Sequence, residues 1–179
     1  MKYRTVLKNF FSFLAILVSL FLFSCTSSRD KMAGGIAKME SEIETAQIVD
    51  SNAVIELLGA YQNFSSKYPD DSLAPEYLFK AAGLALGFNH GEQAIDLYES
   101  IIHTYPDYKK APECFFMEAF TYENTLKNIG KANDYYNEFL IRYPNHELAD
   151  DARTAIKYLG KSPDDMVREW EKTNTDSIK

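Results

Sequence analysis

The sequence predicts an all-α protein, built as an α-solenoid of antiparallel helix pairs. Three Tyr-Pro dipeptides begin at Tyr68, Tyr105 and Tyr143, at spacings of 37 and 38 residues. Each proline is followed five residues later by an alanine. In all three units, apolar or aromatic residues also stand 5, 8 and 12 residues before the proline. A fixed period in this range is typical of repeat arrays whose units stack to bury a shared core.

Each repeat unit is expected to contain two helices. Proline lacks an amide donor and disfavours the α region in the residue before it, so each Tyr-Pro should end a helix. Within a unit, Asn89-His90-Gly91 separates a helix over 74–89 from one over 92–105, and residues 128–130 repeat that break. Residues 74–106 and 111–144 are therefore two complete repeats. Alanine at the start of the later helices permits close approach, and the aromatic residues that follow should be buried.

Partial elements flank these two repeats. Residues 36–47 are expected to form a short polar helix, 52–66 a second-type helix without a full partner, and 148–159 a further first-type helix. Ser162 and Pro163 then begin a helix to about residue 172, which should cap the open end of the solenoid with Met166, Val167 and Trp170. The expected domains are 1–24, a lipoprotein signal peptide; 25–35, a lipidated cysteine and flexible tether; 36–50, a short N-terminal helical segment; and 51–179, the repeat domain with its C-terminal cap.

The first 25 residues predict the destination of the protein. Residues 1–9 carry three basic side chains and no acid, and an apolar stretch of about 14 residues follows. Because spanning the hydrocarbon core takes about 20 residues, a secretory signal fits better than a membrane span; the alternatives are an uncleaved signal anchor and a buried N-terminal helix. Leu22-Phe23-Ser24-Cys25 resembles a bacterial lipobox, which implies lipid transfer to the thiol of Cys25, with palmitate as an attached acyl group, and cleavage before this residue. Thr26 is unlike the aspartate that retains lipoproteins in the inner membrane, so the expected location is the periplasmic face of the outer membrane.

Charge and composition exclude several function classes. The formal net charge of −7 becomes −10 when the three basic residues of the leader are removed, which disfavours nucleic-acid binding. His90, His103 and His146 do not have metal-ligand spacing, and Cys114 is expected to be a small buried apolar group. Acidic pairs such as Glu113 and Glu118 are expected on solvated helix faces or at caps. We therefore expect no enzyme, no metal, no small-molecule substrate and no cofactor beyond the lipid on Cys25.

The repeat units resemble the tetratricopeptide repeat family. The matching positions are a small residue in the first helix (Ala82, Gly83, Ala119), alanine in the second (Ala94, Ala132), an aromatic residue four positions on (Tyr98, Tyr136), and the closing proline (Pro106, Pro144). The usual period in that family is 34 residues. Elongated units of this kind are similar to those of envelope lipoproteins such as the outer-membrane assembly factor BamD, and of the periplasmic coordinator associated with Tol-Pal. The resemblance covers residues 52–159.

The resemblance also implies a site, because the first helices of tetratricopeptide repeats line a concave groove. Projected onto this sequence, the partner-binding groove comprises Glu76, Phe79, Gly83, Leu86, Glu113, Phe116, Phe120, Glu123, Asn124, Asp151, Thr154 and Tyr158. Such a groove suits a protein segment with apolar anchors and basic flanks. The alternative is that Phe79, Phe116 and Phe120 pack between helices.

These observations predict a non-enzymatic, lipid-anchored adaptor for protein-protein interaction in envelope biogenesis. Its first expected role is outer-membrane protein assembly in the manner of BamD, with the β-barrel assembly machinery as partner. The alternatives are a coordinator of cell-envelope or peptidoglycan machinery, and a ligand-binding lipoprotein of an uptake system.

Overall fold

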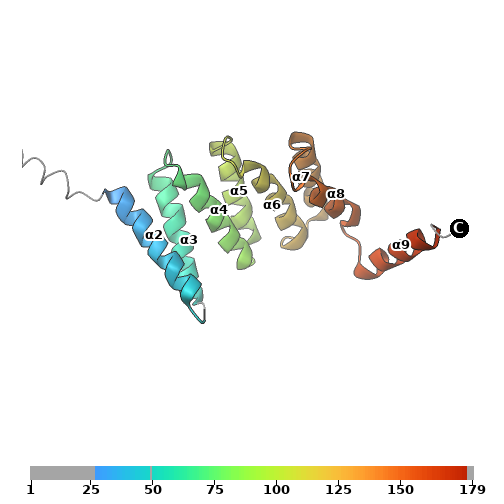
Figure 1. Ribbon diagram of the computed structural model, residues 1–179, viewed down its shortest axis with the longest axis horizontal. Helices are drawn as coiled ribbons and strands as arrows, with labels where there is room; N and C mark the ends of the chain where they lie inside the picture. The colour runs from blue at the N-terminus through green and yellow to red at the C-terminus, as the bar shows by residue number, and fades with distance from the viewer. Residues whose placement is uncertain (1–26, 49, 177–179) are drawn as a thin grey trace, which may run out of the picture.

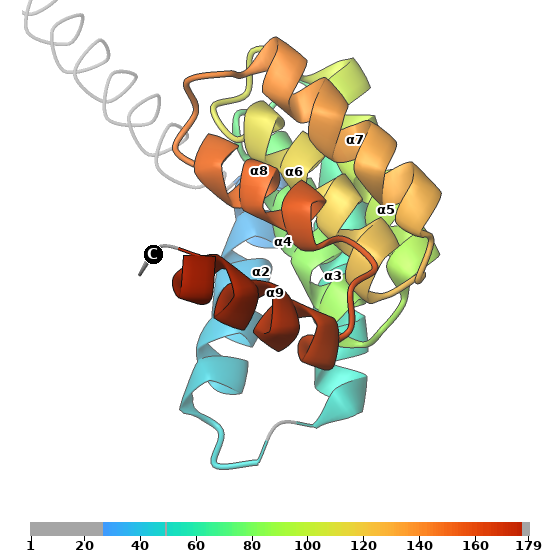
Figure 2. The same cartoon turned by 90° about the vertical axis from the view of Figure 1, so that its right-hand side faces the viewer.

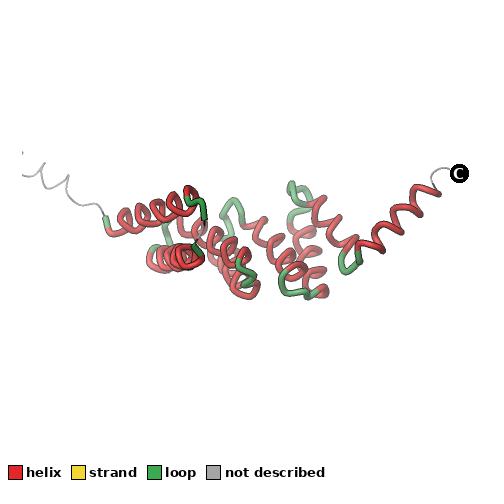
Figure 3. The backbone as a smooth tube through the Cα atoms, turned by 90° about the horizontal axis from the view of Figure 1, so that it is seen from below, coloured by secondary structure: helices red, strands yellow, loops and turns green. Residues whose placement is uncertain are grey.

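Helices follow one another in an elongated row (Figure 1) in the computed structural model, which describes residues 27–48 and 50–176. The elements are α2 (Ser28–Thr45), α3 (Ser51–Lys67), α4 (Leu73–Gly87), α5 (Gly91–Thr104), α6 (Ala111–Asn124), α7 (Ile129–Arg142), α8 (Ala149–Tyr158) and α9 (Pro163–Asp176). Short loops join them, and the described residues contain no strand (Figure 3). Seen along the row, α3, α5 and α7 form one layer and α2, α4, α6 and α8 the other (Figure 2). The expected all-α, tetratricopeptide-like solenoid is confirmed.

The three Tyr-Pro turns share one backbone hydrogen-bond pattern. The amide of Tyr68, Tyr105 or Tyr143 donates to the carbonyl four residues earlier and so closes the second helix of its unit. The amide three residues after each tyrosine then donates back to the tyrosine carbonyl, at 2.9 to 3.1 Å. Since the same turn recurs after each second helix, the chain enters each following unit in the same direction. The period seen in the sequence is thus also a structural period.

The core lies between the two layers. The predicted inner residues of α5 and α7 are buried, namely Ala94, Tyr98, Ile101, Ala132, Tyr136 and Phe139. One apolar cluster extends from α2 to α6 and a second from α5 to α8, so that α5 and α6 contribute to both. Consecutive helices pack on one another from α2 to α8. Stacking of neighbouring units therefore buries the apolar faces that a single helix pair leaves open.

The N-terminal boundary differs from the predicted one, because α2 begins at Ser28 within the expected tether. The Ser27 hydroxyl accepts a hydrogen bond from the Asp30 amide and caps the helix. Arg29 forms two hydrogen bonds to the Asp71 carboxylate, at 2.7 and 3.0 Å, and Ile36 is only 2% exposed. Packing of this face outweighs the low helix propensity of Gly34-Gly35, which lie on the exposed side. A flexible tether over residues 28–35 is therefore wrong, and α2 supplies the partner that α3 was expected to lack.

The C-terminal end also differs from expectation. A helix is present as α9, and the Ser162 hydroxyl accepts from the Asp165 amide at its start. However, Val167 is 55% and Trp170 67% exposed, so these side chains do not cover the end of the array. Gly160, at φ +72°, redirects the chain after α8, and α9 extends away from the row (Figures 1 and 3). The predicted capping role of α9 is wrong in this conformation.

The expected signal peptide and Cys25 lie outside the described residues. Across residues 27–48 and 50–176, no helix combines the length and apolar character needed to span a bilayer.

Candidate partner-binding surfaces

The first-helix layer carries the side chains that were expected to line a groove. None of them is fully buried: Gly83, Phe120, Asn124, Asp151 and Thr154 are exposed, and Glu76, Phe79, Leu86, Glu113, Phe116, Glu123 and Tyr158 are half-buried. They thus share a layer and remain at least partly accessible. Their contacts separate those that are free for a partner from those that the fold already uses.

Two of the three phenylalanines pack against second helices. The Phe79 ring lies edge-on to Tyr98, with centroids 5.9 Å apart. The Phe116 ring does the same with Tyr136 and Phe139, at 5.5 and 5.8 Å. Phe120 differs, since it is 37% exposed. Phe79 and Phe116 therefore stabilise helix packing, and Phe120 is the aromatic side chain of this set that is best placed to meet a partner.

Internal donors occupy two of the expected acidic groups. The Tyr108 hydroxyl and the Lys110 ammonium donate to the Glu76 carboxylate, at 2.6 and 3.2 Å. Partial burial opposes ionisation of Glu76, but these hydrogen bonds outweigh it and lower the pKa of the carboxyl. The Tyr136 hydroxyl likewise donates to Glu123 at 2.9 Å. The first-helix layer therefore offers a partner less free negative charge than its sequence indicates.

Cys114 is buried, as the sequence predicts. Burial raises the pKa of its thiol, and the neighbouring carboxyls Glu118 and Glu113 raise it further. Because the thiolate is the nucleophilic form, this cysteine is poorly suited to covalent chemistry.

A second surface, which sequence reasoning missed, lies between the second helices α5 and α7 above α6. It consists of two adjoining pockets of about 470 and 290 Å³, and Glu99 lines both of them. We call it the α5–α7 groove. Its α5 wall consists of Glu92, Asp96, Glu99 and His103, its α7 wall of Lys131, Tyr135, Glu138 and Arg142, and its floor includes Phe115, Glu118 and Tyr122 of α6. Each wall is a single helix face, because its residues follow one another at intervals of three and four.

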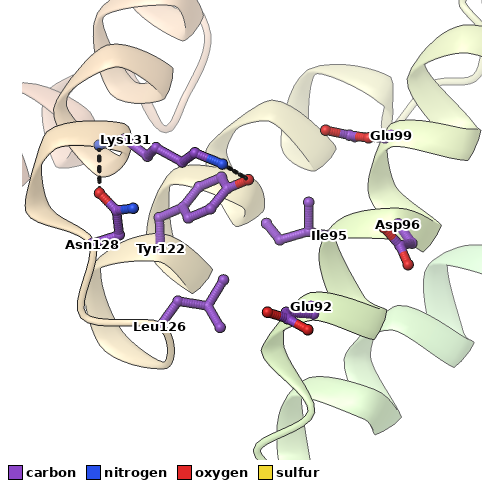
Figure 4. A pocket seen from close by; sticks show the side chains of 8 residues that line it. All are labelled: Glu92, Ile95, Asp96, Glu99, Tyr122, Leu126, Asn128 and Lys131. Atoms are coloured by element: carbon purple, nitrogen blue, oxygen red, sulfur yellow. Dashed lines mark hydrogen bonds between the residues drawn. The ribbon is translucent and has the colours of Figure 1, made fainter.

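The two walls differ in charge. On α7, Lys131 donates to the Tyr122 hydroxyl and lies 4.8 Å from the centre of that ring, as Figure 4 shows for the larger pocket. The Arg142 guanidinium pairs with Glu138 and lies 4.8 Å from the Phe115 centroid. On α5, the carboxylates line the opposite side of the pocket in Figure 4. The α7 cations are thus already engaged within their own wall and floor.

Glu118 lies at the floor of the smaller pocket and is 1% exposed. No described residue donates a hydrogen bond to either of its carboxyl oxygens. Burial raises the pKa of this carboxyl to about 8, and the negative charges of Glu99 and Glu138 act in the same direction. The expectation that Glu118 lies on a solvated face is wrong. The repeat itself contained a signal of this burial. Glu118 stands seven residues after the alanine that begins its unit, and the residues at the same position after Ala74 and Ala149 are the apolar Ala81 and Ile156.

Within the described residues, no group of three or more His, Cys, Asp or Glu side chains is arranged to hold a metal ion.

Comparison with known families agrees with the observed architecture. A family model described as a tetratricopeptide repeat matches residues 113–146, which include nearly all of α6 and the whole of α7. No curated protein matches the chain. Such repeats generally mediate protein-partner binding and are generally non-catalytic scaffolds. Residues 113–146 are therefore a tetratricopeptide repeat, set within an α-solenoid of the same type.

Proposed function

We propose that the chain is a lipid-anchored, non-enzymatic adaptor that holds a protein partner during cell-envelope biogenesis. The observation that carries this proposal is the joining of a lipobox-like sequence, Leu22 to Cys25, to a tetratricopeptide solenoid. The first supplies a site for acylation and the second supplies recognition surfaces. The one cysteine of the described residues, Cys114, is buried, which makes its thiol poorly suited to act as a nucleophile.

The anchor would be Cys25, acylated and inserted in the outer membrane from the periplasmic side. One acyl chain gives only marginal membrane binding, whereas lipobox processing supplies three. Because α2 begins at Ser28, only about 11 Å of chain separates the anchor from the solenoid, at 3.3 to 3.6 Å per residue. The solenoid would therefore be held close to the bilayer, and a partner would have to be reached at or near the membrane surface.

Within envelope biogenesis, assembly of outer-membrane β-barrel proteins is the first candidate, supported by the resemblance of the elongated Tyr-Pro units to those of BamD. The length of the array favours a second candidate, a coordinator of peptidoglycan or other envelope machinery. The described helices form three pairs, α2–α3, α4–α5 and α6–α7, followed by α8, whereas BamD carries more repeats.

Two linked measurements test this function. The full chain would be expressed in a Gram-negative host with an alkyne analogue of palmitate, beside a Cys25→Ala variant. We expect label in the outer-membrane fraction for the wild type and none for the variant. Wild-type chain that remains unlabelled and soluble would contradict the anchor.

Affinity purification from the same membranes, with mass spectrometry of the recovered proteins, tests the adaptor role. Recovery of a β-barrel insertion pore supports the first candidate, and recovery of Tol-Pal components or peptidoglycan synthases supports the second. An eluate that matches an untagged control would contradict the adaptor function.

A further inference from the structure

We propose that the α5–α7 groove binds a basic segment of the partner protein, and that the pocket above Glu118 holds one arginine or lysine side chain of that segment. This inference rests on the proposed adaptor function and adds to it the chemistry of the partner and the surface that receives it.

The charge of the groove is the first argument. Glu92, Asp96 and Glu99 form a continuous acidic stripe along α5, and neither Glu92 nor Asp96 has an ion-pair partner among the described residues. The Tyr135 hydroxyl reaches Glu99 only at 3.4 Å. The two cations of the opposite wall lie over aromatic rings of the α6 floor. The α5 side of the groove is therefore complementary to positive charge.

The second argument is the energetic cost of burying the Glu118 carboxyl without a hydrogen-bond donor. A buried carboxyl without hydrogen-bond donors is unfavourable in a folded protein, and apolar residues fill the same register position in α4 and α8. The fold therefore does not need a carboxyl there. A guanidinium or ammonium group in the pocket would donate to the two free oxygens and compensate the buried charge.

The aromatic walls of the pocket also suit a cation. Phe115 and Tyr135 line it together with Glu118, Glu99 and Glu138. Arg142 shows the geometry at the rim, where its guanidinium lies 4.8 Å from the Phe115 centroid while pairing with Glu138. A second guanidinium deeper in the pocket would combine carboxylate hydrogen bonds with contact to an aromatic face.

The dimensions fit one side chain from an extended segment. A volume of about 290 Å³ lies just below the usual range for small-molecule sites, about 300 to 1,000 Å³. From Glu92 to His103 the α5 stripe spans about 16 Å, at 1.5 Å per residue of helix. An extended segment of about five residues covers that distance.

Binding should be coupled to proton release. When the pocket is empty, burial keeps the pKa of Glu118 near 8, so the carboxyl is mostly neutral at pH 7. An incoming cation favours the ionised form, and the proton leaves to solvent. The groups that face Glu118 are Glu99 and His103 from α5, Tyr135, Glu138 and Arg142 from α7, and Cys114 from its own helix. Affinity for a basic segment should therefore rise with pH up to about pH 8.

The test uses the full chain purified in detergent and a fluorescent, amidated pentapeptide, Arg-Ser-Arg-Ser-Arg. Its controls replace every arginine with norleucine or with glutamate. We expect binding of the arginine peptide alone, and loss of about tenfold or more in affinity at pH 8 for Glu118→Gln, because a charge-assisted hydrogen bond is removed. Glu147→Gln is the control for the loss of one carboxylate, since Glu147 is exposed and lines neither pocket of the groove. Circular dichroism confirms that both variants are folded.

Three outcomes would overturn the site: equal binding of the norleucine peptide, an affinity that Glu118→Gln does not change, or the same loss with Glu147→Gln. A pH series provides a readout that a purely structural role would not give. In a His103→Gln background, affinity should rise from pH 6 to pH 8 for the Glu118 protein and stay flat for Glu118→Gln.

Purification from membranes separates this site from the adaptor function itself. If wild type and Glu118→Gln recover the same partner in equal amounts, the adaptor function stands and the site is overturned. If Glu118→Gln loses a partner that Glu147→Gln retains, both are supported.

Discussion

The α5–α7 groove and the equivalent positions one repeat earlier, on α3, α4 and α5, are built on the same repeat, yet they carry different side chains. Shifting the acidic stripe of α5 back by one period of 37 residues gives Ile55, Gly59, Gln62 and Ser66 on α3. The same shift replaces Glu118 on the floor by Ala81, which is fully buried. The earlier repeat thus has an apolar residue at the floor position and neutral residues at the wall positions, whereas the α5–α7 groove has a carboxyl at both.

The opposite walls differ in the same way. A period of 38 residues relates Lys131, Tyr135, Glu138 and Arg142 of α7 to Gln93, Leu97, Ser100 and Thr104 of α5. The inner positions, such as Tyr98 and Tyr136, do not change. Stacking therefore requires only the inner positions, and the groove positions are free to vary. The repeated inner positions therefore specify the architecture, and the positions at which one unit departs from the repeat indicate where a candidate site lies.

Placing a carboxyl at the floor position of the earlier repeat should have the largest effect. Ala81→Glu introduces a charge at a fully buried position, so we expect a loss of about 4 kcal/mol in the free energy of unfolding. Urea denaturation measures this loss. Ala81→Gln is the control for added volume, and the two variants should diverge as the pH rises. A loss below about 1 kcal/mol for Ala81→Glu would mean that the two floors are equivalent.

Stability should fall with rising pH because of Glu118. Its pKa is raised to about 8 in the folded state from an ordinary value of 4.5, so between these values the folded state binds a proton that the unfolded state has lost. The free energy of unfolding should decrease by about 1.4 kcal/mol per pH unit in that window, or about 3 kcal/mol between pH 5 and pH 8. Denaturation of Glu118→Gln across the same range should lack this slope. Parallel curves for the two proteins would contradict the assignment.

The junction at the start of α5 gives a smaller effect. A Cβ on Gly91 would lie 2.8 Å from Thr125 Cγ2 and 2.9 Å from Leu126 Cδ2. Gly91→Ala should therefore cost about 2 kcal/mol through overpacking, and it should shift Leu126, which lines the larger pocket. Gly130→Ala is the matched control in the next unit, where the nearest atom is 3.7 Å away and no loss is expected. Thermal unfolding of both variants checks the comparison, which fails if the two behave alike.

The smallest effect concerns the first-helix layer. Phe120 corresponds to Gly83 one period earlier, and both are exposed, so the fold does not need a side chain at this position. Phe120→Ala should change the free energy of unfolding by about 0.5 kcal/mol or less. Phe116→Ala, which removes a ring packed on Tyr136 and Phe139, should cost about 3 kcal/mol. Urea denaturation of the pair distinguishes them, and a large loss for Phe120→Ala would place its ring in the core.

Much of the fold could be predicted because the repeat is periodic. The bounds of α3 to α8 could be predicted to within a few residues from the Tyr-Pro breaks, the small residues and the inner aromatic residues. The start of α2 could not be predicted, since Gly34-Gly35 suggest a loop and the contact that opposes this, between Arg29 and Asp71, joins residues 42 apart. The exposure of α9 depends on the direction in which the chain leaves Gly160, which an amphipathic pattern does not specify.

The candidate site was harder to predict. Family geometry directed attention to the first-helix layer, where Glu76, Phe79 and Phe116 are partly used in packing. The α5–α7 groove is built from two helices of different repeats and a floor from the helix between them. Local sequence does not determine how these three helices are rotated relative to one another. The burial of Glu118 could have been inferred only by comparing it with Ala81 and Ile156.

The most direct test of the account is the titration of the Glu118 carboxyl itself. With ¹³C-labelled glutamate in the full chain, and Glu118→Gln to assign the signal, carbon NMR would follow its ionisation with and without the arginine pentapeptide. We predict a titration near pH 8 without peptide and a clear downward shift on binding. A carboxyl that titrates near 4.5, or one that the peptide leaves unchanged, would contradict the claim that the α5–α7 groove is a site for a basic partner.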